Sequence, residues 1–325
     1  MGPREHRKKL GHVGKRSQDL GFRLGTGLFG LALLLIVVAI GFELTRQSML
    51  SIQKFGFSFW RTEIWDPVAG EFGALPFIWG TFYSSILALA LATPIALGIA
   101  VFISELCPAH LKQPLVFLTE LLAAIPSIVY GLWGIFVMVP AVRAFETAMP
   151  APLRQLPFFS GPPFGVGMLS AGLILAVMII PFTSSVAREV LKAVPMAQRE
   201  GAYALGATRF EAIGAAIFYA RTGIVGAIML GFGRALGETM AVTMVIGNNP
   251  KISLSLFAPQ YTMAAVIANE FTEAVDELYL DALIEIGLVL FIVTLMVNSL
   301  SRLLIWSMAR SASAAPVPAP AEAIA

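Results

Sequence analysis

The sequence contains little charge, few histidines and a single cysteine. Only 13% of its 325 residues are Asp, Glu, Lys or Arg, whereas a soluble globular domain usually carries about a quarter. Its composition is 57% hydrophobic and includes long apolar runs, which is typical of a membrane protein. The lone Cys107 excludes an intrachain disulfide, and together with the three histidines it offers no metal-ligand spacing.

The sequence also lacks a nucleotide-binding loop and a zinc-protease motif. GHVGKR at residues 11–16 has neither the spacing nor the final Ser or Thr of a phosphate-binding loop. We therefore expect a chain that is not an enzyme and that binds no metal and no cofactor of its own.

Six apolar runs are long enough to cross a bilayer as helices. They predict an all-α, polytopic membrane protein with six transmembrane helices. The first run is too long for a signal-peptide core and no cleavage site follows it, so we interpret it as an uncleaved anchor. The runs cover residues 24–44, 76–106, 115–142, 166–187, 222–247 and 282–305.

The segments between the runs define the predicted layout of the chain. It consists of a basic cytoplasmic tail at 1–23, a first transmembrane helix with an outer aromatic segment at 24–75, a transmembrane domain at 76–306 that includes a cytoplasmic loop at 188–221, and a disordered tail at 307–325.

Basic residues are distributed unevenly between the two sides of the membrane. The N-terminal tail, the 188–221 loop and the C-terminal end carry more Lys and Arg than the alternate segments. Because segments rich in Lys and Arg remain in the cytoplasm, both termini and the 188–221 loop are predicted to be cytoplasmic. The acidic segment 270–281 then lies outside.

Aromatic residues crowd between residues 45 and 75, where Phe55, Phe59 and Trp65 stand beside Arg61. Such a mixture fits a membrane interface or a small surface subdomain. Two interpretations remain open, a lid packed over the helix ends and a docking surface for another protein.

The 188–221 loop has the pattern of two short helices around Gly206. Glycine accepts the left-handed conformation that ends many helices. Thr208 with Glu211 three residues later is the pattern of a capping box that begins the next helix. Phe210, Ile213 and Ile217 then form an apolar stripe, which we expect to be exposed to the cytoplasm unless a partner covers it.

Glu200-Gly201-Ala202, with Gly206 four residues further on, resembles the EAA loop of ABC importer permeases. In that family the loop forms the coupling helices that enter a groove of the ATPase subunit. The sequence departs from the family at Gly201, where alanine is usual, and at Phe218-Tyr219, where Leu-Pro is usual. The resemblance implies that the ATPase is contacted by Glu200, Gly201, Ala202, Gly206, Thr208 and Phe210.

The fifth apolar run carries two charges, Arg234 and Glu238, which lie four residues apart and would share one helix face. A charge near the bilayer centre costs about 2.5–3.5 kcal/mol on insertion scales, so neither is expected to face lipid. Two interpretations compete. The charges hold the bundle together by pairing with each other or with a neighbouring subunit, or Arg234 attracts a passing oxyanion that Glu238 orients.

Three motifs extend the resemblance over residues 77–310. They are GRALGETMAV at 233–242, AAIPSIVYGLWG at 123–134 and FISEL at 102–106. They resemble the PstC permeases, a family of membrane subunits of bacterial high-affinity phosphate importers. The resemblance implies a type I ABC importer permease fold in the inner membrane, and it implies that Arg234 and Glu238 belong to the substrate pathway.

The resemblance also implies a heteromeric assembly without nucleic acid. The expected partners are a PstA-like second permease, two copies of a PstB-like ATPase that uses ATP and Mg²⁺, and a PstS-like phosphate-binding protein on the outer side.

Three alternatives remain. The chain could be a permease subunit for another oxyanion such as sulfate or molybdate, or a mainly structural permease subunit. An intramembrane enzyme would need paired acid, base or metal groups, whereas Glu120, Glu285 and Asn298 are scattered over the spans.

Overall fold

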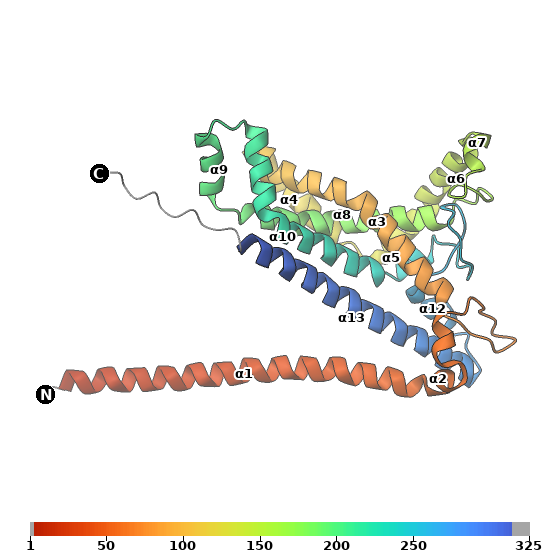
Figure 1. Cartoon of the computed structure of the whole chain (residues 1–325), viewed down its shortest axis with the longest axis horizontal. Helices are drawn as coiled ribbons and strands as arrows, with labels where there is room; N and C mark the ends of the chain where they lie inside the picture. Colours follow the sequence, from red (N-terminus) through yellow and green to blue (C-terminus); the bar gives the residue numbers. More distant parts are fainter. Residues whose placement is uncertain (1–2, 314–325) are drawn as a thin grey trace.

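The computed structural model describes residues 3–313, and the side chains of residues 21–308, as a helical bundle (Figure 1). Every named element in this part of the chain is helical. In chain order the elements are α1 (Pro3–Gln47), α2 (Met49–Phe55), the 3₁₀ turn η1 (Gly56–Trp60), α3 (Leu75–Val101), the π-helical turn η2 (Phe102–Leu106), α4 (Ala109–Ala124), α5 (Ser127–Trp133), the π-helical turn η3 (Gly134–Met138), α6 (Val139–Ala148), α7 (Ala151–Arg154), α8 (Met168–Lys192), α9 (Met196–Ala204), α10 (Arg209–Leu236), α11 (Met240–Thr243), α12 (Met263–Glu270) and α13 (Glu277–Ser313).

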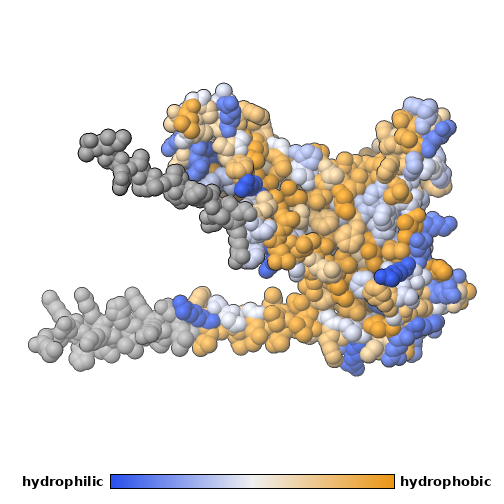
Figure 2. Space-filling model, in the orientation of Figure 1, coloured by the Kyte–Doolittle hydropathy of each residue, from blue (hydrophilic) through white to orange (hydrophobic). Residues whose placement is uncertain are grey.

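Six helical segments in the described part of the chain are long and apolar enough to span a membrane, which confirms the predicted number. Figure 2 shows hydrophobic residues over the middle of the molecule and most hydrophilic ones gathered toward its two ends. The spanning segments are Gly21–Gln47, Leu75–Leu106, Ser127–Ala148, Met168–Lys192, Arg209–Leu236 and Glu277–Met308.

The fourth spanning helix, α8, is the centre of the bundle. Of the residues in the most apolar 18-residue stretch of α8, 61% are buried in the bundle, against 0% in the corresponding stretch of α1. Ala88 and Ala92 of α3 pack into one core with Ala171 and Leu175 of α8, because small side chains let two helix backbones approach closely. Helix α1 lies apart from the bundle along most of its length and meets α13 near its own C-terminal end (Figure 1).

The third apolar run, predicted at residues 115–142, is divided between two helices, and the third spanning segment begins only at Ser127. Helix α4 ends at Ala124, and α5 begins after Pro126. Pro126 has no N–H, so the carbonyl of Leu122, four residues earlier, loses its helical donor. The Tyr130 hydroxyl donates to that carbonyl at 2.8 Å, which satisfies the freed acceptor inside the bundle.

Both ends of the chain are more helical than predicted. Helix α1 begins at Pro3, so the basic segment expected to form a separate tail continues the first spanning helix. Helix α13 continues to Ser313, so residues 307–313 are not the disordered tail expected there. Extending an existing helix adds one hydrogen bond per residue without a new nucleation cost, which favours both extensions. Residues 314–325 of the expected tail lie outside the described residues.

The aromatic segment between α1 and α3 packs over the helix ends. Phe59 and Phe72 are fully or almost fully buried among residues of α3, α12 and α13. The indole N–H of Trp65 donates to Glu270 at 2.8 Å, and the Tyr279 hydroxyl donates to the same carboxylate oxygen at 2.7 Å. These contacts favour the lid interpretation, and they pair one acidic residue of the 270–281 segment with the lid.

Candidate transport pathway and coupling hairpin

The two helices predicted around Gly206 form a hairpin that projects from one end of the bundle (Figure 1). Gly206 has a φ of +85°, the left-handed conformation that the sequence predicted. Its N–H donates to the carbonyl of Tyr203 at 2.9 Å, and the N–H of Ala207 donates to the carbonyl of Ala202 at 3.1 Å. This pair of bonds is a Schellman motif, which satisfies the last carbonyls of α9 and turns the chain toward α10.

The predicted capping box begins α10. The Thr208 N–H donates to the Glu211 carboxylate at 2.7 Å, and the Glu211 N–H donates to the Thr208 hydroxyl at 3.4 Å. The sequence analysis assigned residues 188–221 to the cytoplasmic loop and residues 222–247 to the fifth apolar run. Helix α10 is one 28-residue helix that belongs to both, so the hairpin and the spanning segment are joined by continuous backbone hydrogen bonds.

The apolar edge of the hairpin differs from the predicted stripe. Ile213 is buried, whereas Phe210 is 85% exposed and Leu205 is 91% exposed. Phe210 lies in the first turn of α10, and Leu205 lies in the turn between the two helices. The exposed apolar surface is therefore the tip of the hairpin. Glu200 and Gly201 are exposed, and Ala202 is half-buried.

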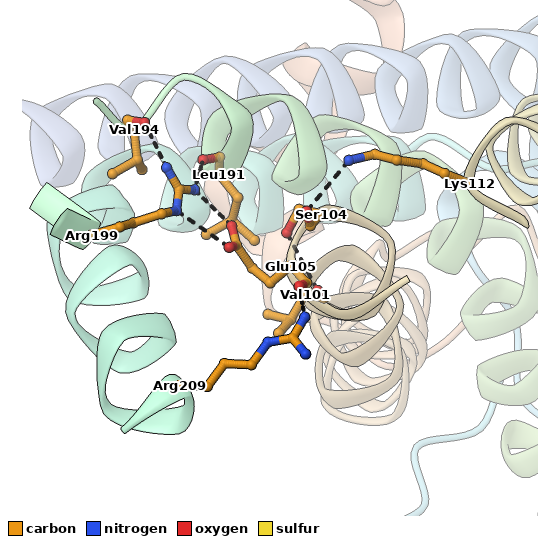
Figure 3. Close-up of polar contacts among 8 residues, drawn as sticks. All are labelled: Val101, Ser104, Glu105, Lys112, Leu191, Val194, Arg199 and Arg209. Atoms are coloured by element: carbon orange, nitrogen blue, oxygen red, sulfur yellow. Dashed lines mark hydrogen bonds and ion pairs between the residues drawn. The ribbon is translucent and has the colours of Figure 1, made fainter. Parts of the chain in front are cut away.

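Beneath the hairpin lies a charged cluster that sequence reasoning missed. Glu105, in the turn η2, pairs with Arg199 of α9, and both side chains are largely buried, at 12% and 15% exposed (Figure 3). Removing one partner of a buried pair costs about 3–5 kcal/mol, because the other charge stays without a partner. A carboxylate at the end of an apolar run was the available signal, but the sequence did not indicate which arginine it meets.

Helix α10 crosses the bundle against α8 through small residues. Ala227 and Gly231, four residues apart, are both buried there. A Cβ added at Gly231 would lie 2.5 Å from the Thr183 hydroxyl and 2.9 Å from Ile179. Gly233 and Gly237 have the same spacing but do not act in the same way, because Gly237 follows the helix and has open space around it.

The structure corrects the predicted relation between Arg234 and Glu238. Helix α10 ends at Leu236, so Arg234 lies in its last turn while Glu238 follows in the non-helical link to α11. The two residues therefore do not share a helix face. Glycine at position 237 favours this early end, since glycine weakens a helix interior. Among residues 21–308, no ion pair joins Arg234 to Glu238 or to another carboxylate of this chain.

Arg234 is exposed, and its guanidinium carbon lies 5.6 Å from the centre of the Phe182 ring on α8. Arg234 lies in the last turn of α10, and this helix stops short of the end of the bundle where α2 and α12 lie (Figure 1). An arginine presents five donors in a planar fork, and here the ring contact is its one described side-chain partner. This arrangement leaves the donors free for an anion or a neighbouring subunit.

No group of three or more metal-ligating side chains occurs in the described part of the chain. The charged side chains predicted for this site are the exposed Arg234 guanidinium and the half-buried Glu238 carboxylate. A guanidinium is suited to binding an oxyanion.

Comparison with known families identifies this architecture. A family model for the inner membrane component of binding-protein-dependent transport systems matches residues 96–310. The chain belongs to this family. It is therefore a multi-pass membrane permease, and the region that the family model covers includes the hairpin, α8, α10 and Arg234.

Curated relatives of this permease extend the similarity beyond the family region. The phosphate transport system permease protein PstC of Haemophilus influenzae is 48% identical over 293 residues, which cover 88% of this chain and 93% of the relative. PstC of Mesorhizobium japonicum is 43% identical, covering 87% and 89%. A probable PstC of Methanocaldococcus jannaschii is 37% identical, covering 82% and 86%.

Among solved structures, the permease resembles a chain of the MetNI methionine ABC transporter in an inward-facing conformation. The TM-score is 0.53 at 15% sequence identity, and the match covers 70% of this chain and 93% of that chain. At this identity the likeness concerns the fold alone. The fold is that of a type I ABC importer permease, as the sequence predicted.

Proposed function

We propose that this chain is the permease subunit of an ATP-driven importer that moves inorganic phosphate across the cytoplasmic membrane. One observation carries the proposal. Relatives from three organisms that are 37–48% identical along most of this chain are named phosphate transport system permease protein PstC. The match spans at least 86% of each of these three relatives, so it concerns the whole permease and not one segment.

The chemistry around Arg234 supports an oxyanion as the transported species. The guanidinium fork matches two phosphate oxygens at once, and such charge-assisted bonds are stronger than neutral ones. The exposed side chain has no carboxylate partner among the described residues, so an arriving anion displaces no internal ion pair. A charge without a partner in lipid is costly, which supports a water-filled path at the interface with a second permease.

Glu238 supports phosphate over sulfate. Phosphate near neutral pH carries at least one P–OH group, which can donate to a carboxylate, whereas sulfate has none. If Glu238 lies on the path of the anion, its carboxylate accepts a bond from phosphate and repels sulfate. The same repulsion limits how tightly phosphate is held, and a transported ion must also be able to leave.

The family and the hairpin support a proposed assembly of several subunits. A PstA-like permease completes the path, and a PstS-like protein delivers phosphate from outside. Two copies of a PstB-like ATPase bind ATP and Mg²⁺ and contact the hairpin tip through Glu200, Gly201, Ala202, Gly206, Thr208 and Phe210. Both termini and the hairpin are cytoplasmic, and this chain itself holds no cofactor and no metal.

Uptake by the complete complex in proteoliposomes tests this function. Labelled phosphate should accumulate inside vesicles when ATP is present on the hairpin side, and an excess of unlabelled sulfate or molybdate should not compete. Uptake of labelled sulfate or molybdate with no uptake of phosphate would assign the chain to another oxyanion. An Arg234→Gln complex that no longer assembles would favour the mainly structural role.

A further inference from the structure

Resting on the proposed function, we propose that Glu105 is a positioning residue that ties the coupling hairpin to α3. The hairpin's displacement by the ATPase is then passed to α3 as well as to α10. The cluster around Glu105 consists of Glu105 itself with Arg199 and Arg209 (Figure 3). These residues lie outside the predicted ATPase contact and away from Arg234.

The turn η2 places the Glu105 carboxylate beneath the hairpin. At the end of this turn the Cys107 N–H donates to the carbonyl of Phe102, five residues earlier, at 2.8 Å. Such π-helical turns occur frequently at functional sites. The Glu105 carboxylate accepts two bonds from the Arg199 guanidinium, at 2.7 Å from Nη2 and 3.3 Å from Nε. The fork-to-carboxylate geometry fixes the direction as well as the distance of the contact.

Arg199 also holds the end of α8. Its Nη1 donates to the carbonyl of Val194 at 2.8 Å, and its Nη2 donates to the carbonyl of Leu191 at 3.0 Å. The last carbonyls of a helix have no partner within the helix, so these bonds satisfy acceptors of α8 and of the link that follows it. One guanidinium therefore joins α9, α8 and the end of α3.

Arg209 bonds the start of α10 to the same residue, Glu105. Its Nη2 donates to the backbone carbonyl of Glu105 at 2.6 Å (Figure 3). Both helices of the hairpin are thus bonded to one residue, α9 through the side chain of Glu105 and α10 through its backbone. A side-chain substitution at Glu105 removes the first contact and leaves the second acceptor in place.

Within the hairpin, α9 has little else to hold it. No residue of α9 is buried, so this helix has no apolar anchor in the bundle. Glu200, the next residue after Arg199, is exposed, while the Arg199 side chain is largely buried against Glu105. Without the charged contact, α9 remains connected to α8 by residues 193–195 and to α10 by the Gly206 turn, but it is no longer bonded to α3.

Glu105→Gln in the complete complex tests this role, because glutamine keeps the shape but removes the charge. We expect ATP hydrolysis to continue and phosphate moved per ATP to fall by at least about fivefold, the lower end of usual coupling effects. Glu105→Asp, which keeps the carboxylate, should recover part of the loss. Glu43→Gln removes an exposed pair on α1 and should leave the ratio unchanged.

Cys107 provides a second readout that does not depend on the transported ion. It is the single cysteine of the chain and stands two residues after Glu105. Labelling of its thiol, followed by mass spectrometry of that peptide, should change when ATP is added to the wild-type complex. The ATP-dependent change should be lost in Glu105→Gln. If the wild type moved no phosphate but showed this pattern, the proposed function would fail while the inference stood.

Several outcomes would overturn the inference. One is an unchanged amount of phosphate moved per ATP in Glu105→Gln. Another is an equal ATP-dependent change in Cys107 labelling in the wild type and Glu105→Gln. A third is no ATP-dependent change in Cys107 labelling in the wild type. If Glu105→Gln does not assemble, Arg199→Lys is the deciding variant, because it keeps the charge and loses the fork. A wild-type ratio and wild-type Cys107 labelling in Arg199→Lys would then reject the positioning role.

Discussion

Two pairs of arginine and glutamate in this chain differ in whether their charges meet. Arg199 and Glu105 meet at 2.7 Å beneath the hairpin, and two nearby carbonyls accept further guanidinium N–H groups. Arg234 and Glu238 are four residues apart in sequence, yet the end of α10 separates them and no ion pair forms. The charges of the first pair find their partners within this chain, whereas those of the second pair do not pair with each other.

The difference lies in how the backbone presents each residue. The π-helical turn η2 and the inward face of α9 bring two distant residues together in a largely buried place. The early end of α10 separates two residues that a longer helix would have stacked one above the other. A satisfied pair transmits force between elements, whereas unsatisfied donors inside a membrane are available for a ligand or a partner.

The largest expected effect comes from removing the Arg234 guanidinium. Arg234→Gln removes charge-assisted bonds worth about 1.5–3 kcal/mol, so phosphate uptake should fall by about 10- to 150-fold. Arg234→Lys should keep part of the activity, because it retains the charge without the fork. Uptake in proteoliposomes measures both variants, and co-purification of all subunits is the control for assembly.

A smaller effect is expected at the hairpin turn. Gly206→Val places a β-branched residue at a φ of +85°, which costs an L residue roughly 1–2 kcal/mol. Binding of the ATPase to the permease should weaken by about 5- to 30-fold. Gly206→Asn is the matched control, since asparagine tolerates this conformation. Equal binding by the two variants would show that the turn does not position the ATPase contact.

Gly231→Ala tests how closely α10 must approach α8 to place Arg234. The new Cβ would lie 2.5 Å from the Thr183 hydroxyl, and such overpacking typically costs 1–3 kcal/mol. The melting temperature of the purified complex should fall. Gly226→Ala lies on the same helix, meets its nearest neighbour at 3.6 Å and should leave the melting temperature unchanged. A Gly231→Ala complex as stable as the wild type would contradict this packing.

Phe182→Leu should have the smallest effect. It removes the ring under the Arg234 guanidinium, a contact worth about 0.5–1 kcal/mol at an exposed site. We expect uptake to fall by about two- to fivefold because the side chain is less well oriented before the anion arrives. Phe182→Tyr keeps a ring and should match the wild type. A loss of uptake as large as that of Arg234→Gln would mean that the ring has another role.

Much of the fold could be predicted because it follows from local signals. Apolar run length predicted the six spans, Gly206 predicted the turn, and Thr208 with Glu211 predicted the start of α10. Each signal depends on residues close together in the sequence. The resemblance of the short motifs to known permeases then predicted the family that the comparison confirmed.

The parts that sequence reasoning missed depend on tertiary contacts. Hydropathy continues past Leu236, so it did not indicate that α10 ends there and separates Arg234 from Glu238. The partner of Glu105 lies 94 residues away, and no spacing rule links the two. The roles assigned to Arg234 and the hairpin turn remain predictions that the variants above test, and the role of Glu238 remains a prediction.

The most direct test is a reconstruction of the complete complex with phosphate bound, at a resolution that shows side chains. The account predicts an anion within hydrogen-bond distance of the Arg234 guanidinium, at the interface between the two permeases, with Glu105 and Arg199 still paired. An Arg234 side chain paired with a carboxylate of the second permease, and an anion bound elsewhere, would contradict it.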